Sequence, residues 1–294
     1  MNHRPLAAAL WMIGAICAFT AMAIATRQIN GVHDTFEILA YRSMIGWVLV
    51  VALAAAFARL RDIRTERLPS HVVRNIFHFT GQSLWFWAIT MIPLAQVFAL
   101  EFTSPIWVIL LSPIFLGERL TPRKLAAAAL GFAGVLIVAR PDFGHIEPGV
   151  LAAAGAAFFF AATNLMTKAL TKGEPILSIL FWLTLMQAVF GTVAMTAFGT
   201  VTLPTLATLP WLVLIGISGI TAHFSLTTAL SLAPASTVVP VDFARLPIIA
   251  VVGALFYDEQ VPPTLYAGAA LIFLGIWITL NGATRQQGPS VTKP

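Results

Sequence analysis

Four charged residues lie inside long apolar stretches and are the first candidates for chemistry: Arg42, Glu101, Asp242 and Arg245. If these stretches cross a membrane, each unpaired charge costs about 2.5 to 3.5 kcal/mol at a helix centre. Four such charges would cost about 12 kcal/mol, which is comparable to the stability of a whole domain. Asp242 and Arg245 are three residues apart, so a helix allows a local ion pair. The charges therefore either lock helices together or lie on the path of a polar solute.

A polar stripe is the second feature. His78, Gln82 and Trp85 recur at helical spacing, and His223 and Thr227 repeat part of this pattern later in the chain. Such a stripe faces neighbouring helices or a watery cavity, because lipid offers its polar groups no partner. The alternative to a cavity is interhelical hydrogen bonding, at about 0.6 kcal/mol per bond. Weaker candidates for the cavity wall are Tyr41, Trp107, Phe102, Phe243, Asn164 and Gln187. Glu37 lies near a span end, where we expect it at the membrane interface.

Prolines indicate where two helices break. The stretch that contains Glu101 carries Pro105 and Pro113, and the stretch that contains Asp242 carries Pro240 and Pro247. Each proline removes a backbone donor and frees the carbonyl four residues earlier. Helices broken at corresponding positions of two repeats predict a binding site at mid-depth, and a packing kink is the alternative.

Signatures of other chemistry are missing. The sequence has no GxxxxGK[ST], HExxH or GxSxG string, and Cys17 is its single cysteine. We therefore expect no catalytic residues, no cofactor, no metal site and no internal disulfide. Any energy for transport would come from gradients, with Glu101, Asp242, His78 and His223 as the groups able to take up protons.

The elements that position these residues follow from composition. Of the 294 residues, 59% are hydrophobic and only 10% are charged, and the mean hydropathy is +0.87. This composition predicts a multi-pass membrane protein and disfavours nucleic-acid binding and soluble enzymology. Ten continuously apolar runs predict ten transmembrane helices and no barrel: 6–26, 36–58, 75–92, 94–116, 123–139, 149–170, 176–198, 210–231, 233–256 and 264–281.

The distribution of basic residues predicts orientation. Counted loop by loop, 13 of the 17 Lys and Arg residues fall on the side of the N-terminus and 2 on the other side. The positive-inside rule then places both termini in the cytoplasm. We expect the protein itself to lie in the inner membrane of the cell. Ala23-Ile24-Ala25 has the pattern of a signal-peptide cleavage site. However, the first run is longer than a signal core, and the repeat described next needs it as a helix.

The chain repeats itself when each position i is compared with position i + 141. Between 93 and 137, 13 of 45 positions are identical to their counterparts at this offset, which also places Glu101 on Asp242 and Gln82 on His223. Each half then holds five helices, and an odd number makes the second half enter the membrane in the opposite sense. We expect a first repeat at 1–146, an inverted second repeat at 147–283, and a disordered cytoplasmic tail at 284–294.

The segment Leu94 to Val138 contains Glu101-Phe102-Thr103-Ser104-Pro105, Leu116-Gly117-Glu118-Arg119-Leu120 and Gly131-Phe132-Ala133-Gly134-Val135. It resembles the EamA repeat of the drug/metabolite transporter superfamily. The second copy resembles it less closely, with Glu259 as the matched residue. The resemblance implies a cytoplasmic-membrane carrier without specifying cargo or direction.

The expected function is therefore a secondary transporter of small organic metabolites that works by alternating access as a monomer in the bilayer, with amino-acid export as the first interpretation. Two alternatives stay open: uptake of a cofactor-like solute such as S-adenosylmethionine, and an integral-membrane enzyme acting on lipid-linked substrates. The residues expected to line the solute site are Trp85, Gln82, His78, Glu101, His223, Asp242, Arg245, Arg42, Tyr41 and Asn164.

Overall fold

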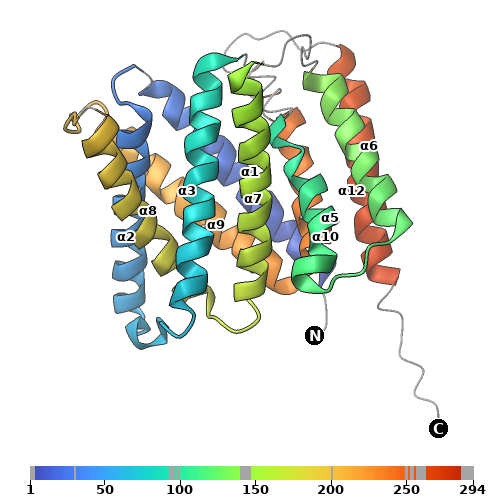
Figure 1. Ribbon diagram of the computed structural model, residues 1–294, viewed down its shortest axis with the longest axis horizontal. Coiled ribbons are helices and arrows are strands. Elements are labelled where there is room, and N and C mark those ends of the chain that lie inside the picture. The colour runs from blue at the N-terminus through green and yellow to red at the C-terminus, as the bar shows by residue number, and fades with distance from the viewer. Residues whose placement is uncertain are drawn as a thin grey trace.

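The apolar runs fold into helices packed side by side (Figure 1). The computed structural model describes residues 4–29, 31–92, 97, 100–139, 147–199, 201–248, 251, 255 and 263–285. Over these residues the protein is helical and contains no extended strand. A helix satisfies its backbone hydrogen bonds within one segment, which is what lipid requires.

The α-helices are α1 Pro5–Gln28, α2 Thr35–Ala56, α3 Leu68–Met91, α5 Ser104–Leu116, α6 Pro122–Ala139, α7 Pro148–Leu170, α8 Ile176–Phe198, α9 Leu209–Leu232, α10 Ala235–Val238 and α12 Pro263–Arg285. Two 3-10 segments, η1 Leu60–Asp62 and η2 Val239–Ala244, connect or extend them. The predicted tail lies outside the described residues from position 286 onward.

Six helices of the described chain are long and apolar enough to cross a membrane: α1, α2, α7, α8, α9 and α12. This shows a multi-pass membrane protein, while the count of ten spans stays a prediction. The third span differs from its predicted range of 75–92, because α3 begins at Leu68. Its first two turns carry His71 and Arg74, whose polarity hid them from a search for apolar runs.

Both helices that were expected to break are interrupted. In the first half, α5 begins at Ser104 with Pro105 in its first turn, and Glu101 lies just before it. In the second half, the four-residue α10 passes into η2, which contains Pro240 and Asp242. A proline fits the first turn of a helix, where its missing N–H has no partner to lose. The two acidic residues therefore lie where the backbone changes course.

The repeat is visible in where helices begin. The offset of 141 places Thr35 of α2 on Ile176 of α8, Leu68 of α3 on Leu209 of α9, and Pro122 of α6 on Pro263 of α12. The most extensive helix pairs are α1 with α9, α6 with α12, α3 with α7, and α2 with α8. Each pair takes one helix from each half, and exchanging the halves returns the same set of pairs.

Paired glycines allow α6 and α12 to approach each other closely. A Cβ atom at Gly134 would lie 2.5 Å from the carbonyl oxygen of Gly268, and one at Gly275 would lie 2.6 Å from that of Ala127. Gly134 and Gly275 correspond under the repeat, so each half supplies the same small residue to this contact. Small residues at such positions let helix backbones pack without intervening side chains.

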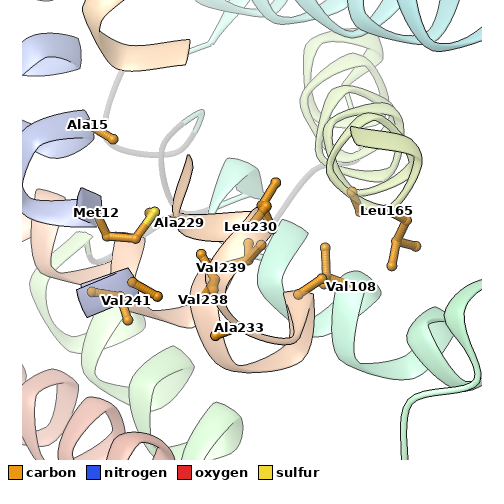
Figure 2. Close-up of a cluster of buried hydrophobic side chains, with 13 residues drawn as sticks. Met12, Ala15, Val108, Leu165, Ala229, Leu230, Ala233, Val238, Val239 and Val241 are labelled. Atoms are coloured by element: carbon orange, nitrogen blue, oxygen red, sulfur yellow. The ribbon is translucent and has the colours of Figure 1, made fainter. Parts of the chain in front are cut away.

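Apolar packing holds the interrupted segment of the second half. Figure 2 shows buried side chains from α1, α5, α7, α9 and the α10–η2 segment converging, with Met12, Val108, Leu165, Leu230 and Val239 among them. All five are at most 4% exposed. Because residues from both halves fill this cluster, the irregular backbone around Asp242 is supported from several sides.

Candidate functional site

A cavity of about 180 Å³ lies between the two halves. Nine of the ten residues expected at the solute site line it: Arg42, His78, Gln82, Trp85, Glu101, Asn164, His223, Asp242 and Arg245. The other lining residues are Phe19, Met22, Arg74, Phe86, Phe102, Ser104, Pro105, Phe160, Thr163, Leu226 and Val239. The cavity therefore joins charged, amide, imidazole and aromatic groups from both repeats.

An arginine bound to two carboxylates forms one side of the cavity. Arg245 Nη2 donates to Glu101 Oε1 at 2.6 Å and to Asp242 Oδ2 at 3.0 Å. The Trp85 indole nitrogen donates to Glu101 Oε2 at 2.7 Å. The guanidinium carbon of Arg245 also lies 5.2 Å from the ring centre of Phe102, within the range of a cation–π contact. We call Arg245, Glu101 and Asp242 the carboxylate cluster.

The predicted pair of Asp242 and Arg245 is present, and Glu101 joins it across the repeat. One carboxylate oxygen remains available: Asp242 Oδ1 is buried and accepts no hydrogen bond within the described chain. The cluster links the interrupted segments of both halves, as a structural lock would. Its position on the cavity wall also leaves a role in solute binding open.

Two further arginines line the cavity without an acidic partner. Arg42 Nη2 donates to the side-chain oxygen of Gln82 at 2.5 Å, and Arg74 Nε donates to the Thr167 hydroxyl at 2.8 Å. Arg74 is 2% exposed. Neither forms an ion pair in the part of the chain that the structure describes. We call Arg42 and Arg74 the arginine wall.

A chain of amides connects the two members of the arginine wall. Gln82, which accepts from Arg42, donates to Gln187 at 3.0 Å, and Gln187 donates to the side-chain oxygen of Asn75 at 3.2 Å. The same oxygen of Asn75 accepts from Arg74 at 3.4 Å. Every acceptor in this chain is neutral, so it orients the guanidinium groups without neutralising them.

The two predicted histidines face each other in the cavity. The rings of His78 and His223 have centroids 5.1 Å apart and are nearly perpendicular. Phe19 contacts His223 edge to face at 5.7 Å, and Phe160 lies 6.3 Å from His78. Neither ring nitrogen of His78 has a hydrogen-bond partner among the described residues. Among the described residues, His78 therefore offers two ring nitrogens without hydrogen bonds, next to the aromatic rings of Phe160 and His223.

Much of the cavity lining is related by the repeat. The offset of 141 pairs Phe19 with Phe160, Met22 with Thr163, Gln82 with His223, Trp85 with Leu226, Glu101 with Asp242, and Ser104 with Arg245. The arginine wall breaks this relation, because Arg42 and Arg74 correspond to Leu183 and Ile215. Both of these aliphatic residues are buried.

Some predicted residues lie elsewhere. Tyr41 does not line the cavity, because its hydroxyl donates to the backbone oxygen of Thr202 at 2.7 Å. Glu37 lies in the first turn of α2 and is fully buried: it completes the capping box and accepts from His33 and from the backbone of Thr202. Trp107 is 40% exposed and packs on Phe158.

Phe243 packs against Phe102 behind the cavity, and Gln187 belongs to the amide chain. Arg74 is the main residue that sequence reasoning missed, since it was assigned to a loop. It lies four residues before His78 on the same helix. Extending the predicted polar stripe by one turn would have found it.

Two charged groups bind the connection between α9 and α10, at the end of the molecule where α1 begins (Figure 1). Glu118 accepts from the backbone nitrogens of Ala235 and Ser236 at the start of α10, and from the Ser236 hydroxyl. Lys168 donates to the backbone oxygens of Leu230 and Ala233 at the end of α9. We call Glu118 and Lys168 the end latch.

A multi-pass helical protein whose two repeats enclose a polar cavity has the architecture of a membrane carrier. The model of the EamA-like transporter family matches residues 6–140 and 147–281. The chain therefore belongs to this family and is a transporter, not an enzyme. The match covers both repeats, which confirms the two-repeat architecture.

Several relatives are transporters of small metabolites. The chain is 32% identical to a riboflavin transporter from Rhizobium johnstonii, with 98% of this chain and 95% of that protein covered. It is 30% identical to a riboflavin transporter from Vibrio cholerae, with 97% of both covered. An S-adenosylmethionine uptake transporter from Rickettsia bellii is 22% identical over 89% of each chain. These relatives support a membrane transporter of small metabolites.

A solved crystal structure superposes with a TM-score of 0.81 at 20% identity, covering 96% of this chain and 99% of the other. At that identity the likeness shows the fold alone.

Proposed function

We propose that this transporter takes up a flat, heteroaromatic, vitamin-like solute of the riboflavin type. The observation that carries the proposal is the cavity wall, where aromatic faces of Phe19, Trp85 and Phe102 surround amide, imidazole and charged groups. A planar ring system binds to such a wall by stacking, while its polar edge forms hydrogen bonds. The two relatives named riboflavin transporters support the same class of solute.

The first interpretation, amino-acid export, has less support. Binding a zwitterion by Arg245 and Asp242 would need both groups to be free, but they already bind each other, and Arg245 also binds Glu101. Uptake of S-adenosylmethionine is the second candidate, and the Rickettsia relative favours it. That solute also carries a flat heteroaromatic ring, so both candidates use the same aromatic wall.

Alternating access between inverted halves is the proposed mechanism, in the inner membrane with both termini in the cytoplasm. In support, α1 begins and α12 ends at the same end of the molecule (Figure 1). Glu118 of the first half binds the start of α10 in the second half at this end. Under the repeat, the end-latch residues Glu118 and Lys168 correspond to Glu259 and Arg27. The other half of the repeat therefore carries an acidic and a basic residue at the same two positions.

The deciding experiment is counterflow in proteoliposomes loaded with unlabelled solute. We expect uptake of labelled riboflavin and little or no uptake of labelled amino acids. Trp85→Ala should raise the half-saturation concentration about tenfold or more, because base-like rings lose about 1 to 3 kcal/mol when a stacking partner is removed.

Trp107→Ala is the matched control, since it removes an indole that lies outside the cavity. Trp85→Phe keeps an aromatic ring but loses the hydrogen bond to Glu101. This variant therefore separates the contribution of stacking from that of the hydrogen bond. Equal affinities in the Trp85→Ala and wild-type proteins, or labelled uptake of amino acids alone, would contradict the proposal.

A further inference from the structure

The arginine wall is an unusual feature for the interior of a membrane protein. Arg42 lies seven residues after the start of α2, and Arg74 lies six residues after the start of α3. At 1.5 Å per residue, both lie about 10 Å inside their helices. Both side chains reach the cavity that is proposed to hold the solute. Because α2 and α3 begin at opposite ends of the molecule (Figure 1), the two positive charges border this space at two different depths.

The carboxylates of the cavity do not compensate these charges. Glu101 and Asp242 are its two acidic lining residues, and both bind Arg245. The cavity lining thus carries three arginines against two carboxylates, with a formal charge of +1 when the histidines are neutral. Each guanidinium of the arginine wall has five N–H donors, and the hydrogen bonds described above use only some of them.

Folding does not require arginine at these positions. The repeat mates Leu183 and Ile215 are 3% and 0% exposed, so the same sites of the second half accept aliphatic side chains. An unpaired buried charge is costly, and such residues in membrane proteins mark solute or ion pathways. The charges must therefore contribute something that the apolar residues of the other half do not.

We propose that the arginine wall is an anion-binding subsite that takes a phosphate or carboxylate group. The planar fork of arginine matches the oxygens of both groups and forms charge-assisted hydrogen bonds with them. The anion either belongs to the transported solute or is a free inorganic anion that enters with it. The proposal rests on the proposed function only in that it places the solute in the same cavity.

The first test measures binding without transport. The melting temperature of the purified protein is followed during titration with phenyl phosphate, inorganic phosphate and chloride, with phenol as the neutral analogue. A subsite for an anion on the solute predicts stabilisation by phenyl phosphate and none by phenol. A subsite for a free anion predicts that inorganic phosphate stabilises the protein at least as much as phenyl phosphate does. Absence of stabilisation by all three anions would overturn the proposal.

Variants locate the subsite. Arg74→Met should lower the apparent affinity for the stabilising anion at least about tenfold, because hydrogen bonds to charged groups are the strong ones. Arg74→Lys keeps the charge and should recover part of that loss. Arg59→Gln is the matched control, because Arg59 is exposed and distant from the cavity lining. Equal anion affinity in Arg74→Met and Arg59→Gln would contradict the assignment to this wall.

The second test uses counterflow. If the solute carries the anion, riboflavin 5′-phosphate should compete with labelled riboflavin better than riboflavin itself, and Arg74→Met should remove this preference. If the anion is free, riboflavin counterflow should instead rise when inorganic phosphate is added to a phosphate-free buffer. Anion-dependent stabilisation without any riboflavin counterflow would refute the flavin solute and leave the subsite standing. Riboflavin counterflow that responds neither to the Arg74→Met substitution nor to added inorganic phosphate would refute the subsite.

Discussion

The carboxylate cluster and the arginine wall border the same cavity, but their charges are handled differently. In the cluster, one guanidinium binds two carboxylates, and an indole holds one of these in place. In the wall, two guanidinium groups bind amide, hydroxyl and thioether acceptors among the described residues. The cluster is built from positions that correspond under the repeat, Glu101 and Asp242, whereas the wall belongs to the first half alone.

This difference separates two uses of buried charge. Charges that attract each other can join the interrupted helices of the two halves, and removing the arginine leaves two carboxylates without a cation. Charges without a counter-charge do not stabilise the packing of helices in this way. The proposed anion would compensate their desolvation penalty when it binds. The comparison predicts that substitution changes the free energy of unfolding strongly in the carboxylate cluster and only slightly in the arginine wall.

The largest effect is expected in the carboxylate cluster. Arg245→Gln leaves Glu101 and Asp242 buried without a cation and should lower the free energy of unfolding by about 3 to 5 kcal/mol. The variant with all three residues neutral, Glu101→Gln, Asp242→Asn and Arg245→Gln, should regain much of this loss. Reversible unfolding in mixed micelles measures both.

Counterflow normalised to folded protein then separates the roles of the cluster. Full transport by the neutral triple variant would identify the cluster as a lock between the halves. Loss of transport in a stable triple variant would place the solute on these groups. A triple variant less stable than Arg245→Gln would contradict the compensation of charges described here.

A much smaller effect on stability is expected in the arginine wall. Arg74→Met should change the free energy of unfolding by no more than about 1 kcal/mol, because the lost hydrogen bonds are offset by the removal of an unpaired buried charge. Its partners keep other contacts: the Thr167 hydroxyl still donates to Thr163, and the Asn75 oxygen still accepts from Gln187.

The same unfolding assay as for the cluster variants provides the measurement. A loss of about 3 kcal/mol or more, the range expected for breaking a buried ion pair, would show that Arg74 is part of the structural framework. The contrast between the two regions would then disappear.

The smallest effect is expected at an exposed ion pair, which sets the scale for both regions. Arg59 and Asp62 are 68% and 43% exposed and lie 2.8 Å apart. Asp62→Asn should change the free energy of unfolding by at most about 1 kcal/mol and leave transport unchanged, because solvent and salt screen the pair. A larger change would mean that surface charge, and not burial, dominates the other measurements.

Several parts of the site could be predicted from the residues alone. The pair of Asp242 with Arg245 follows from their spacing, and the positions of Pro105 and Pro240 mark where the helices break. The stripe of His78, Gln82 and Trp85 does face a cavity. These predictions succeeded because helical geometry and proline chemistry act over a few residues.

Other parts could not be predicted, because they depend on which helices become neighbours. Glu101 lies in the other half of the chain from the arginine it binds, and no local spacing pairs them. Arg74 belongs to the first turns of a helix whose polarity resembles a loop, and its burial comes from packing against other helices. Tyr41 was misplaced because the segment around Thr202 folds back over the start of α2.

The sequence by itself determined that this protein is helical, crosses a membrane several times and consists of two related halves. Composition, continuous apolar runs and the internal repeat suffice for that. Few backbone structures are stable in lipid, and a repeat can be detected by comparing the sequence with itself. Only the tertiary structure decided which buried charges are neutralised. That outcome depends on contacts of a few ångströms between helices far apart in sequence, where electrostatic energy changes steeply with distance.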